Sequence, residues 1–184
     1  GRGRWAIERI EQLGRHTLVQ TPACFPLGGD TLALGGFATV RRGWRVCDLG
    51  CGSGALGLLL LGREPTLSLT GVELDPASAA VAERNMRENE INATILCGDL
   101  RDKHLLPSGG FELVLSNPPW FREGSGGSGG QARMEHTCTL EELCSAAGRL
   151  VKNGGRFALV HRPERLTDVL LSLRAFHLEP KRLQ

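Results

Sequence analysis

Apolar residues recur along this chain with two spacings, one typical of buried strands and the other typical of helices. Short apolar runs predict strands at residues 46–49, 67–74, 93–97, 111–116 and 156–161. Longer segments predict helices at residues 5–13, 55–61, 77–90, 140–152 and 165–176. Because strands and helices alternate from residue 46 onward, we expect an α/β fold with a doubly wound, mostly parallel sheet and helices on both faces.

Signals for the start of a helix support two of these segments. Asp75-Pro76 places a capping side chain directly before a proline at the first helical position. Thr139 precedes Glu142 by three residues, which is the spacing of a capping box before helix 140–152.

Length, charge and apolar content limit the classes of protein to which this chain can belong. A chain of 184 residues can bury a sizeable core, and we expect a single domain over residues 1–184. The net charge of +2 neither requires nor excludes a polyanionic partner. We find no apolar run long enough to cross a bilayer and no secretory signal, so we expect no membrane association and a cytoplasmic location.

Six cysteines are scattered through apolar segments, and we interpret them as reduced, buried thiols. They are Cys24, Cys47, Cys51, Cys97, Cys138 and Cys144. A metal site on Cys138, Cys144 and His136 is the alternative. The spacing of those three residues matches no zinc pattern, so we expect no metal.

Three stretches depart from the regular pattern. Residues 1–43 are expected to form a helical segment that acts as a cofactor lid. Residues 124–130 contain only glycine and serine, which is typical either of a laboratory linker closing a deleted loop or of a natural flexible loop. Residues 178–184 resemble the approach to another strand, so we expect the C-terminal strands of the fold to be truncated.

A glycine-rich turn joins the first strand of the alternating region to its helix. Gly50, Gly52 and Gly54 permit positive φ and let a ligand lie against the backbone. The helix that follows presents free N–H groups, which favour a carboxylate or a phosphate. The turn also satisfies a relaxed dinucleotide fingerprint, and a tight turn without a ligand is the simpler alternative.

Acidic residues at the strand ends add to this turn. Glu73 ends the second strand, about twenty residues further on, where a carboxylate can hold a ribose diol. Asp99 follows the third strand and is placed to accept from an adenine amino group. Asp48 lies inside the first strand, where a buried carboxylate requires a donor. A cofactor ammonium group would supply one, which favours S-adenosylmethionine over a dinucleotide.

Asn117, Pro118, Pro119 and Trp120 directly follow the fourth strand of this series. The Asn117 side-chain oxygen and the Pro118 carbonyl are two acceptors that could bind both hydrogens of a planar NH2 group. They would stabilise the positive charge that develops when its nitrogen attacks a sulfonium methyl group. Trp120 could stack on the ring and keep that nitrogen in line. Each residue alone has a structural explanation, but the combination favours a site.

The chain therefore resembles class I S-adenosylmethionine-dependent methyltransferases, whose fold is a Rossmann-like sheet. In that resemblance the turn from Asp48 to Gly54 binds the cofactor, with Glu73 on its ribose and Asp99 on its adenine. Residues 117–120 resemble the Asn-Pro-Pro-aromatic motif of enzymes that methylate adenine or glutamine amides. Asn117 is predicted to contact the cofactor as well as the substrate amine.

Flanking residues are similar to bacterial tRNA-1-valine adenine-N6 methyltransferases. The similar segments are Gln20 to Ala38, Ala132 to Leu143, Gly154 to Leu166 and Glu179 to Arg182. This similarity implies that Asp30 lies near the methionine end of the cofactor and that the substrate is an adenine in the tRNA anticodon loop. Trp120 stands where that family usually has tyrosine, which preserves stacking and removes a hydroxyl contact.

Other functions remain open at this stage. A glutamine-amide methyltransferase would usually add an N-terminal substrate domain, and too few residues precede Asp48. A cofactor-binding module without catalysis is a third possibility, and a nicotinamide dehydrogenase leaves residues 117–120 unexplained. Contact with tRNA phosphates is expected from basic side chains near the site. The candidates are Arg122, Arg133, Arg162, Arg165, Lys181 and Arg182.

Overall fold

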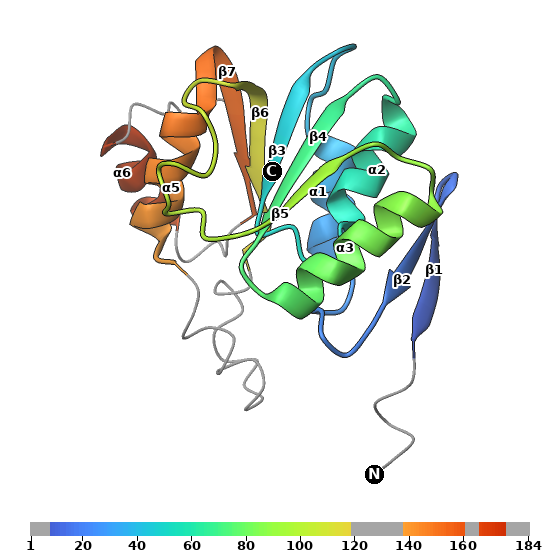
Figure 1. The fold of residues 1–184 in the computed structure, drawn as a ribbon. Coiled ribbons are helices and arrows are strands. Elements are labelled where there is room, and N and C mark those ends of the chain that lie inside the picture. Colours follow the sequence, from blue (N-terminus) through green and yellow to red (C-terminus); the bar gives the residue numbers. More distant parts are fainter. Residues whose placement is uncertain (1–7, 119–137, 161–165, 176–184) are drawn as a thin grey trace.

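The computed structural model describes residues 8–118, 138–160 and 166–175, and every structural statement below concerns those residues. Its main sheet has the strand order β5-β4-β3-β6-β7, and each neighbouring pair is parallel (Figure 1). The strands are β3 (Arg45–Leu49), β4 (Ser68–Glu73), β5 (Thr94–Cys97), β6 (Phe111–Ser116) and β7 (Val151–Leu159). The expected parallel, doubly wound sheet is confirmed.

Helices cover both faces of this sheet and bury two apolar cores. The helices are α1 (Gly29–Phe37), α2 (Ala55–Arg63), α3 (Pro76–Glu88), α5 (Leu140–Leu150) and α6 (Leu166–Ala175). Leu34, Leu58 and Met86 bring α1, α2 and α3 into one core. Leu143 and Val169 bring α5 and α6 into the other, on the opposite face (Figure 1). No helix in the described ranges is long and apolar enough to cross a membrane.

The switch in strand order lies between β3 and β6. From β3 the chain crosses outward to β4 and β5, whereas β6 and β7 lie on the other side of β3. In sheets of this kind, ligands bind beyond the carboxyl ends of the strands at such a switch point. The fold therefore places the glycine turn after β3 and the polar residues after β6 next to each other.

The predicted helix at residues 5–13 is wrong. Within its described part, β1 (Arg9–Leu13) pairs antiparallel with β2 (His16–Gln20), and α1 follows later in residues 1–43. Gly14 has φ +60° while Arg15 does not have positive φ, which suits a two-residue hairpin turn with glycine first. Thr17 and Val19 are β-branched and favour the second strand.

The two helix caps are confirmed, and several predicted boundaries shift by a few residues, most of all around the start of β7. The Asp75 carboxylate accepts from the Ser78 N–H at 3.1 Å, and Thr139 and Glu142 form a reciprocal capping box. Helix α5 ends at Leu150 rather than at residue 152, because β7 starts at Val151. Strand β7 begins earlier than the predicted 156–161 strand because Val151 already pairs with Phe111, and the pairing then shifts register before Leu113 pairs with Arg156.

Candidate active site

The structure brings the predicted polar residues of four strands to one edge of the sheet. Asp48 is the penultimate residue of β3, Glu73 ends β4, Asp99 follows β5 and Asn117 follows β6. Because these strands are parallel neighbours, their carboxyl ends meet at the same edge (Figure 1). Helix α1 also starts there, since Thr31 in its first turn contacts Asn117.

Glycine is required at each predicted position of the turn after β3. Gly50, Gly52 and Gly54 have φ of +76°, +52° and +87°, which other residues rarely adopt. The N–H groups of Gly50 and Cys51 donate to the Val72 carbonyl at 2.8 and 3.0 Å, so the turn is fixed to β4. Gly54 is the N-cap of α2 and supplies no side-chain cap, which leaves the first amides of α2 available to an anion.

Glu73 also holds the turn in place. Its carboxylate accepts from the Gly52 N–H at 2.8 Å and, through the other oxygen, from the Asp75 N–H at 2.9 Å. Each oxygen can accept a second hydrogen bond. The residue predicted to bind a ribose diol therefore keeps that capacity while it joins the loops after β3 and β4.

Asp48 is buried with an uncompensated carboxylate. Its exposed fraction is 3%, and no donor in the described part of the chain forms a hydrogen bond with it. Burial, with a smaller contribution from the charge of Glu73, raises the pKa of Asp48 to about 7. A cationic group bound in the turn would supply the missing partner, so this residue fits the ammonium group of S-adenosylmethionine.

Asp99 is engaged by its neighbour Arg101. The guanidinium binds both carboxylate oxygens, with an Nη2–Oδ2 distance of 2.6 Å, and the Arg101 N–H donates to Oδ1 at 2.9 Å. These contacts lower the pKa of Asp99. Asp99 would have to exchange one of them before it accepted from an adenine amino group.

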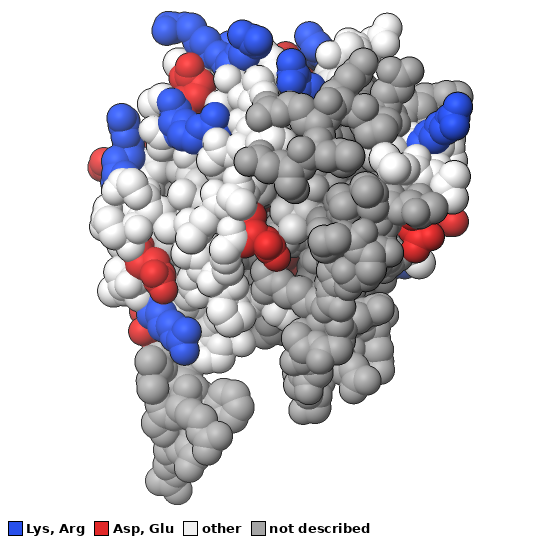
Figure 2. Space-filling model, turned by 180° about the vertical axis from the view of Figure 1, so that it is seen from behind, with Lys and Arg blue, Asp and Glu red and all other residues white. Residues whose placement is uncertain are grey.

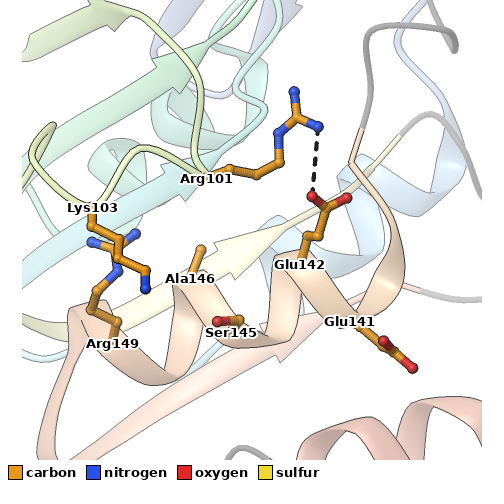
Figure 3. A pocket seen from close by; sticks show the side chains of 7 residues that line it. All are labelled: Arg101, Lys103, Glu141, Glu142, Ser145, Ala146 and Arg149. Atoms are coloured by element: carbon orange, nitrogen blue, oxygen red, sulfur yellow. Dashed lines mark ion pairs between the residues drawn. The ribbon is translucent and has the colours of Figure 1, made fainter.

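Arg101 also extends toward α5, where a shallow pocket of about 320 Å³ lies beside that helix. Its guanidinium approaches the Glu142 carboxylate at 3.5 Å (Figure 3). The pocket is lined by Arg101, Lys103, Glu141, Glu142, Ser145, Ala146 and Arg149 (Figure 3). Cationic and anionic side chains share this pocket, and none of its residues was among the predicted site residues.

Asn117 is half-buried at the end of β6, and its Nδ2 donates to Thr31 Oγ1 at 2.7 Å. Pro118 is buried beside it, whereas Pro119 and the predicted stacking residue Trp120 lie outside the described residues. Asp30 precedes Thr31 in the first turn of α1 and is exposed at the same edge.

Sequence reasoning missed Thr31 and Asn85. Asn85 is fully buried on α3 and donates to the Ser53 carbonyl in the glycine turn at 2.8 Å. Neither residue lies in a recognisable motif, because each acts through a partner far away in the chain. The spacing of four residues between Asn85 and Asn89, which places both on one face of a predicted helix, was the sequence feature that could have indicated Asn85.

Burial disfavours the thiolate form of four cysteines. Burial raises the pKa of Cys138 and of Cys144 to about 11 and also raises the pKa of Cys47 and Cys51. Cys97 is exposed, which corrects the expectation that all six are buried. Within the described residues no group of His, Cys, Asp or Glu could hold a metal ion, and His136 lies outside them.

Comparison with known proteins gives matches along most of the chain. A family model described as the methyltransferase small domain matches residues 31–176. A Porphyromonas gingivalis protein named tRNA1(Val) (adenine(37)-N6)-methyltransferase is 31% identical over 181 residues, covering 92% of this chain and 71% of that protein.

Solved structures share the fold at lower identity. Precorrin-6y C5,15-methyltransferase from Geobacter metallireducens has a TM-score of 0.58 and 19% identity, covering 80% of this chain and 70% of that one. Geranyl diphosphate C-methyltransferase from Streptomyces coelicolor, solved with S-adenosyl-L-homocysteine, has a TM-score of 0.56 and 18% identity, covering 82% of this chain and 53% of that one.

Proposed function

The chain belongs to the methyltransferase small-domain family, and from that premise we propose that it methylates the N6 amino group of an adenine in tRNA. It is an S-adenosylmethionine-dependent methyltransferase. The substrate is proposed because the Porphyromonas gingivalis relative carries that activity in its name. The observation that carries the proposal is the position of Asn117 at the same sheet edge as the glycine turn.

The residues at this edge fit the parts of the cofactor. Asp48 would hold the ammonium group, while the open amides at the start of α2 would accept the carboxylate. Glu73 has lone pairs free for a ribose diol after its two backbone contacts. When bound, S-adenosylmethionine supplies a sulfonium methyl group as the electrophile.

Asn117 and Pro118 supply what an adenine amino group needs. The amide nitrogen of Asn117 donates to Thr31, and no described residue donates to its Oδ1, which can therefore accept from the substrate NH2 group. The Pro118 carbonyl can accept the second hydrogen. Two acceptors stabilise the charge that develops on the attacking nitrogen, and the proton can leave to solvent afterwards. An adenine in a stacked loop must first be extruded from its neighbours.

The proposed contacts with RNA phosphates involve residues outside the described part of the chain. All six basic residues named above as phosphate contacts lie outside the described residues. On the face seen in Figure 2, Lys and Arg side chains gather mainly at the top, the end of the molecule where the sheet strands begin in Figure 1. The proposed site lies at the opposite end of the strands, so this group of cations is not part of it.

A labelled-methyl assay tests the proposal directly. The chain is incubated with radiolabelled S-adenosylmethionine and either bulk unmodified tRNA or a peptide-release factor, and methylated tRNA is digested to nucleosides. We expect label in N6-methyladenosine from tRNA. Asn117→Ala should abolish that label and leave the affinity for S-adenosylhomocysteine intact. Label in release-factor glutamine, or in no substrate, would overturn the proposal.

A further inference from the structure

Ser116, the residue before Asn117, is hydrogen-bonded at the ends of the two strands that flank β6. Ser116 is 1% exposed, and its Oγ donates to the Leu49 carbonyl at the end of β3 at 2.7 Å. The Ser116 carbonyl accepts from the Val160 N–H at 3.2 Å, beyond the end of β7. The strand end that carries Asn117 therefore has a defined position, and only the orientation of its side-chain amide remains to be set.

The Thr31 hydroxyl contacts the nitrogen end of that amide. Asn117 Nδ2 donates to Thr31 Oγ1 at 2.7 Å, across 86 positions of sequence. The two ends of an amide differ, since the nitrogen donates and the oxygen accepts. When Thr31 engages the nitrogen, Oδ1 is directed elsewhere, and none of the described residues donates to it. A rotated amide would present N–H donors to a substrate NH2 group and repel it.

Thr31 is itself carried by a firmly held helix. A Cβ at Gly35 would lie 2.9 Å from Leu59 Cβ, so α1 and α2 are in contact without space between them. The Arg63 guanidinium at the end of α2 donates to the Gly35 and Ala38 carbonyls at 2.7 and 2.8 Å. These contacts fix α1 against α2, which begins at the glycine turn.

We propose that Thr31 is a positioning residue that holds the Asn117 amide with Oδ1 toward the substrate amine. Thr31 touches neither the reacting nitrogen nor the methyl donor. It acts by holding the amide in the orientation of this structure, in which the hydroxyl accepts from Nδ2, so its loss lowers the rate of methyl transfer and leaves cofactor affinity unchanged. This inference rests on the proposed function of Asn117.

Two substitutions separate the hydroxyl from the rest of the side chain. Thr31→Val keeps the shape and removes the acceptor, whereas Thr31→Ser keeps the hydroxyl. Thr31 is half-buried in the first turn of α1, so neither change leaves a large cavity. We expect Thr31→Val to lower kcat about tenfold, the size of one lost hydrogen bond, with KM for S-adenosylmethionine unchanged. Thr31→Ser should recover most of the rate.

A second readout does not depend on activity. The side-chain amide of Asn117 gives a pair of proton–nitrogen NMR signals, identified by their loss in Asn117→Ala. Thr31→Val should shift both signals and increase their exchange with water, whereas Thr31→Ser should leave them near the wild-type positions. Unchanged signals and an unchanged kcat in Thr31→Val would overturn the role of Thr31. Equal loss in the valine and serine variants would also overturn it.

The two readouts keep this inference distinct from the proposed function. If wild-type protein transfers no methyl group to tRNA adenine, the proposed function fails whatever the NMR signals show. If wild-type protein is active and Thr31→Val retains the full rate, the function stands and the positioning role fails.

Discussion

At the residue scale, the candidate site depends on carboxylates whose surroundings differ sharply. Asp48 is buried without a protein donor among the described residues, whereas Glu73 receives two backbone N–H groups and Asp99 receives a guanidinium. Proximity of Glu73 adds to the cost of charging Asp48. The folded protein without a ligand therefore favours a protonated Asp48 up to about neutral pH, and a cationic ligand favours the ionised form.

Ligand affinity should consequently depend on pH through Asp48. With a pKa of about 7 in the free protein, the ionised fraction rises about tenfold from pH 6 to pH 8. We expect S-adenosylhomocysteine to bind about tenfold more tightly at pH 8 than at pH 6. Titration calorimetry in two buffers should detect the proton released on binding at pH 6. Asp48→Asn should bind weakly at both pH values, and an equally steep pH profile in that variant would exclude Asp48.

Stability without a ligand should show the opposite trend. The folded pKa of Asp48 lies above its unfolded value, so its protonated form stabilises the fold fully below about pH 4. That contribution is lost as pH rises through about 7. Between pH 5 and pH 7, Asp48→Asn should therefore lose less unfolding free energy than wild type in urea titrations. Parallel curves for the two proteins would contradict the raised pKa.

Sequence reasoning located the residues that act through strand ends and missed those that act through distant contacts. Asp48 and Glu73 lie near the ends of predicted strands, Asp99 and Asn117 follow predicted strands, and their shared edge results from parallel pairing alone. The bond from Asn117 to Thr31 depends on where α1 packs, which no local pattern encodes. The engagement of Asp99 by Arg101 likewise depends on a loop conformation.

At the element scale, the N-terminal hairpin is attached to α3 by two amide side chains one helical turn apart. Asn85 accepts from the Val19 N–H and donates to the Val19 carbonyl, both at 2.8 Å. Asn89 makes the equivalent pair of bonds with Thr17, at 2.9 and 2.7 Å. Asn85 differs in also reaching the Ser53 carbonyl in the glycine turn.

This difference provides a matched pair of variants. Asn89→Ala should reduce the free energy of unfolding by about 1 kcal/mol, because water can replace bonds at a part-buried site. Asn85→Ala leaves buried backbone groups without partners and should reduce the free energy of unfolding by about 3 kcal/mol. S-adenosylhomocysteine affinity, measured by calorimetry at a temperature where both variants are folded, should fall about tenfold in Asn85→Ala alone. Equal affinities would show that the Ser53 contact does not position the turn.

Adjacent glycines in α1 test how closely that helix packs. A Cβ at Gly35 would meet Leu59 Cδ1 at 2.7 Å, whereas a Cβ at Gly36 has open space. Gly35→Ala should lower the free energy of unfolding by about 1–3 kcal/mol, because the added methyl group overpacks the contact between α1 and α2. Gly36→Ala should raise the free energy of unfolding by about 0.5–1 kcal/mol, because alanine has a higher helix propensity than glycine. Urea unfolding measures both, and a stabilising Gly35→Ala would mean that α1 and α2 can separate without cost.

At the scale of the whole molecule, the alternation of apolar strands and helices was sufficient to predict the parallel sheet. Each predicted strand from residue 46 onward is present, and residues 111–116 match β6 at both ends. The N-terminal hairpin was not predicted, because the exposed residues of β1 carry little period-two signal. Tertiary bonds from α3 add to the local preferences of the Gly14 turn and of β2 in holding that hairpin.

The site is assembled from the ends of β3, β4, β5 and β6 together with α1, so a ligand there should stabilise the molecule as one unit. At a free concentration of 100 times its Kd, a ligand raises the free energy of unfolding by about 2.7 kcal/mol. For a chain of this size, that corresponds to a rise of roughly 5–10 °C in Tm. We expect S-adenosylhomocysteine to shift a single thermal transition by that amount in differential scanning calorimetry. NAD at the same concentration serves as the control, because its pyrophosphate offers Asp48 no cationic partner. A shift produced by NAD alone would contradict the cofactor assignment, and splitting into two transitions would show that the strands do not unfold as one unit.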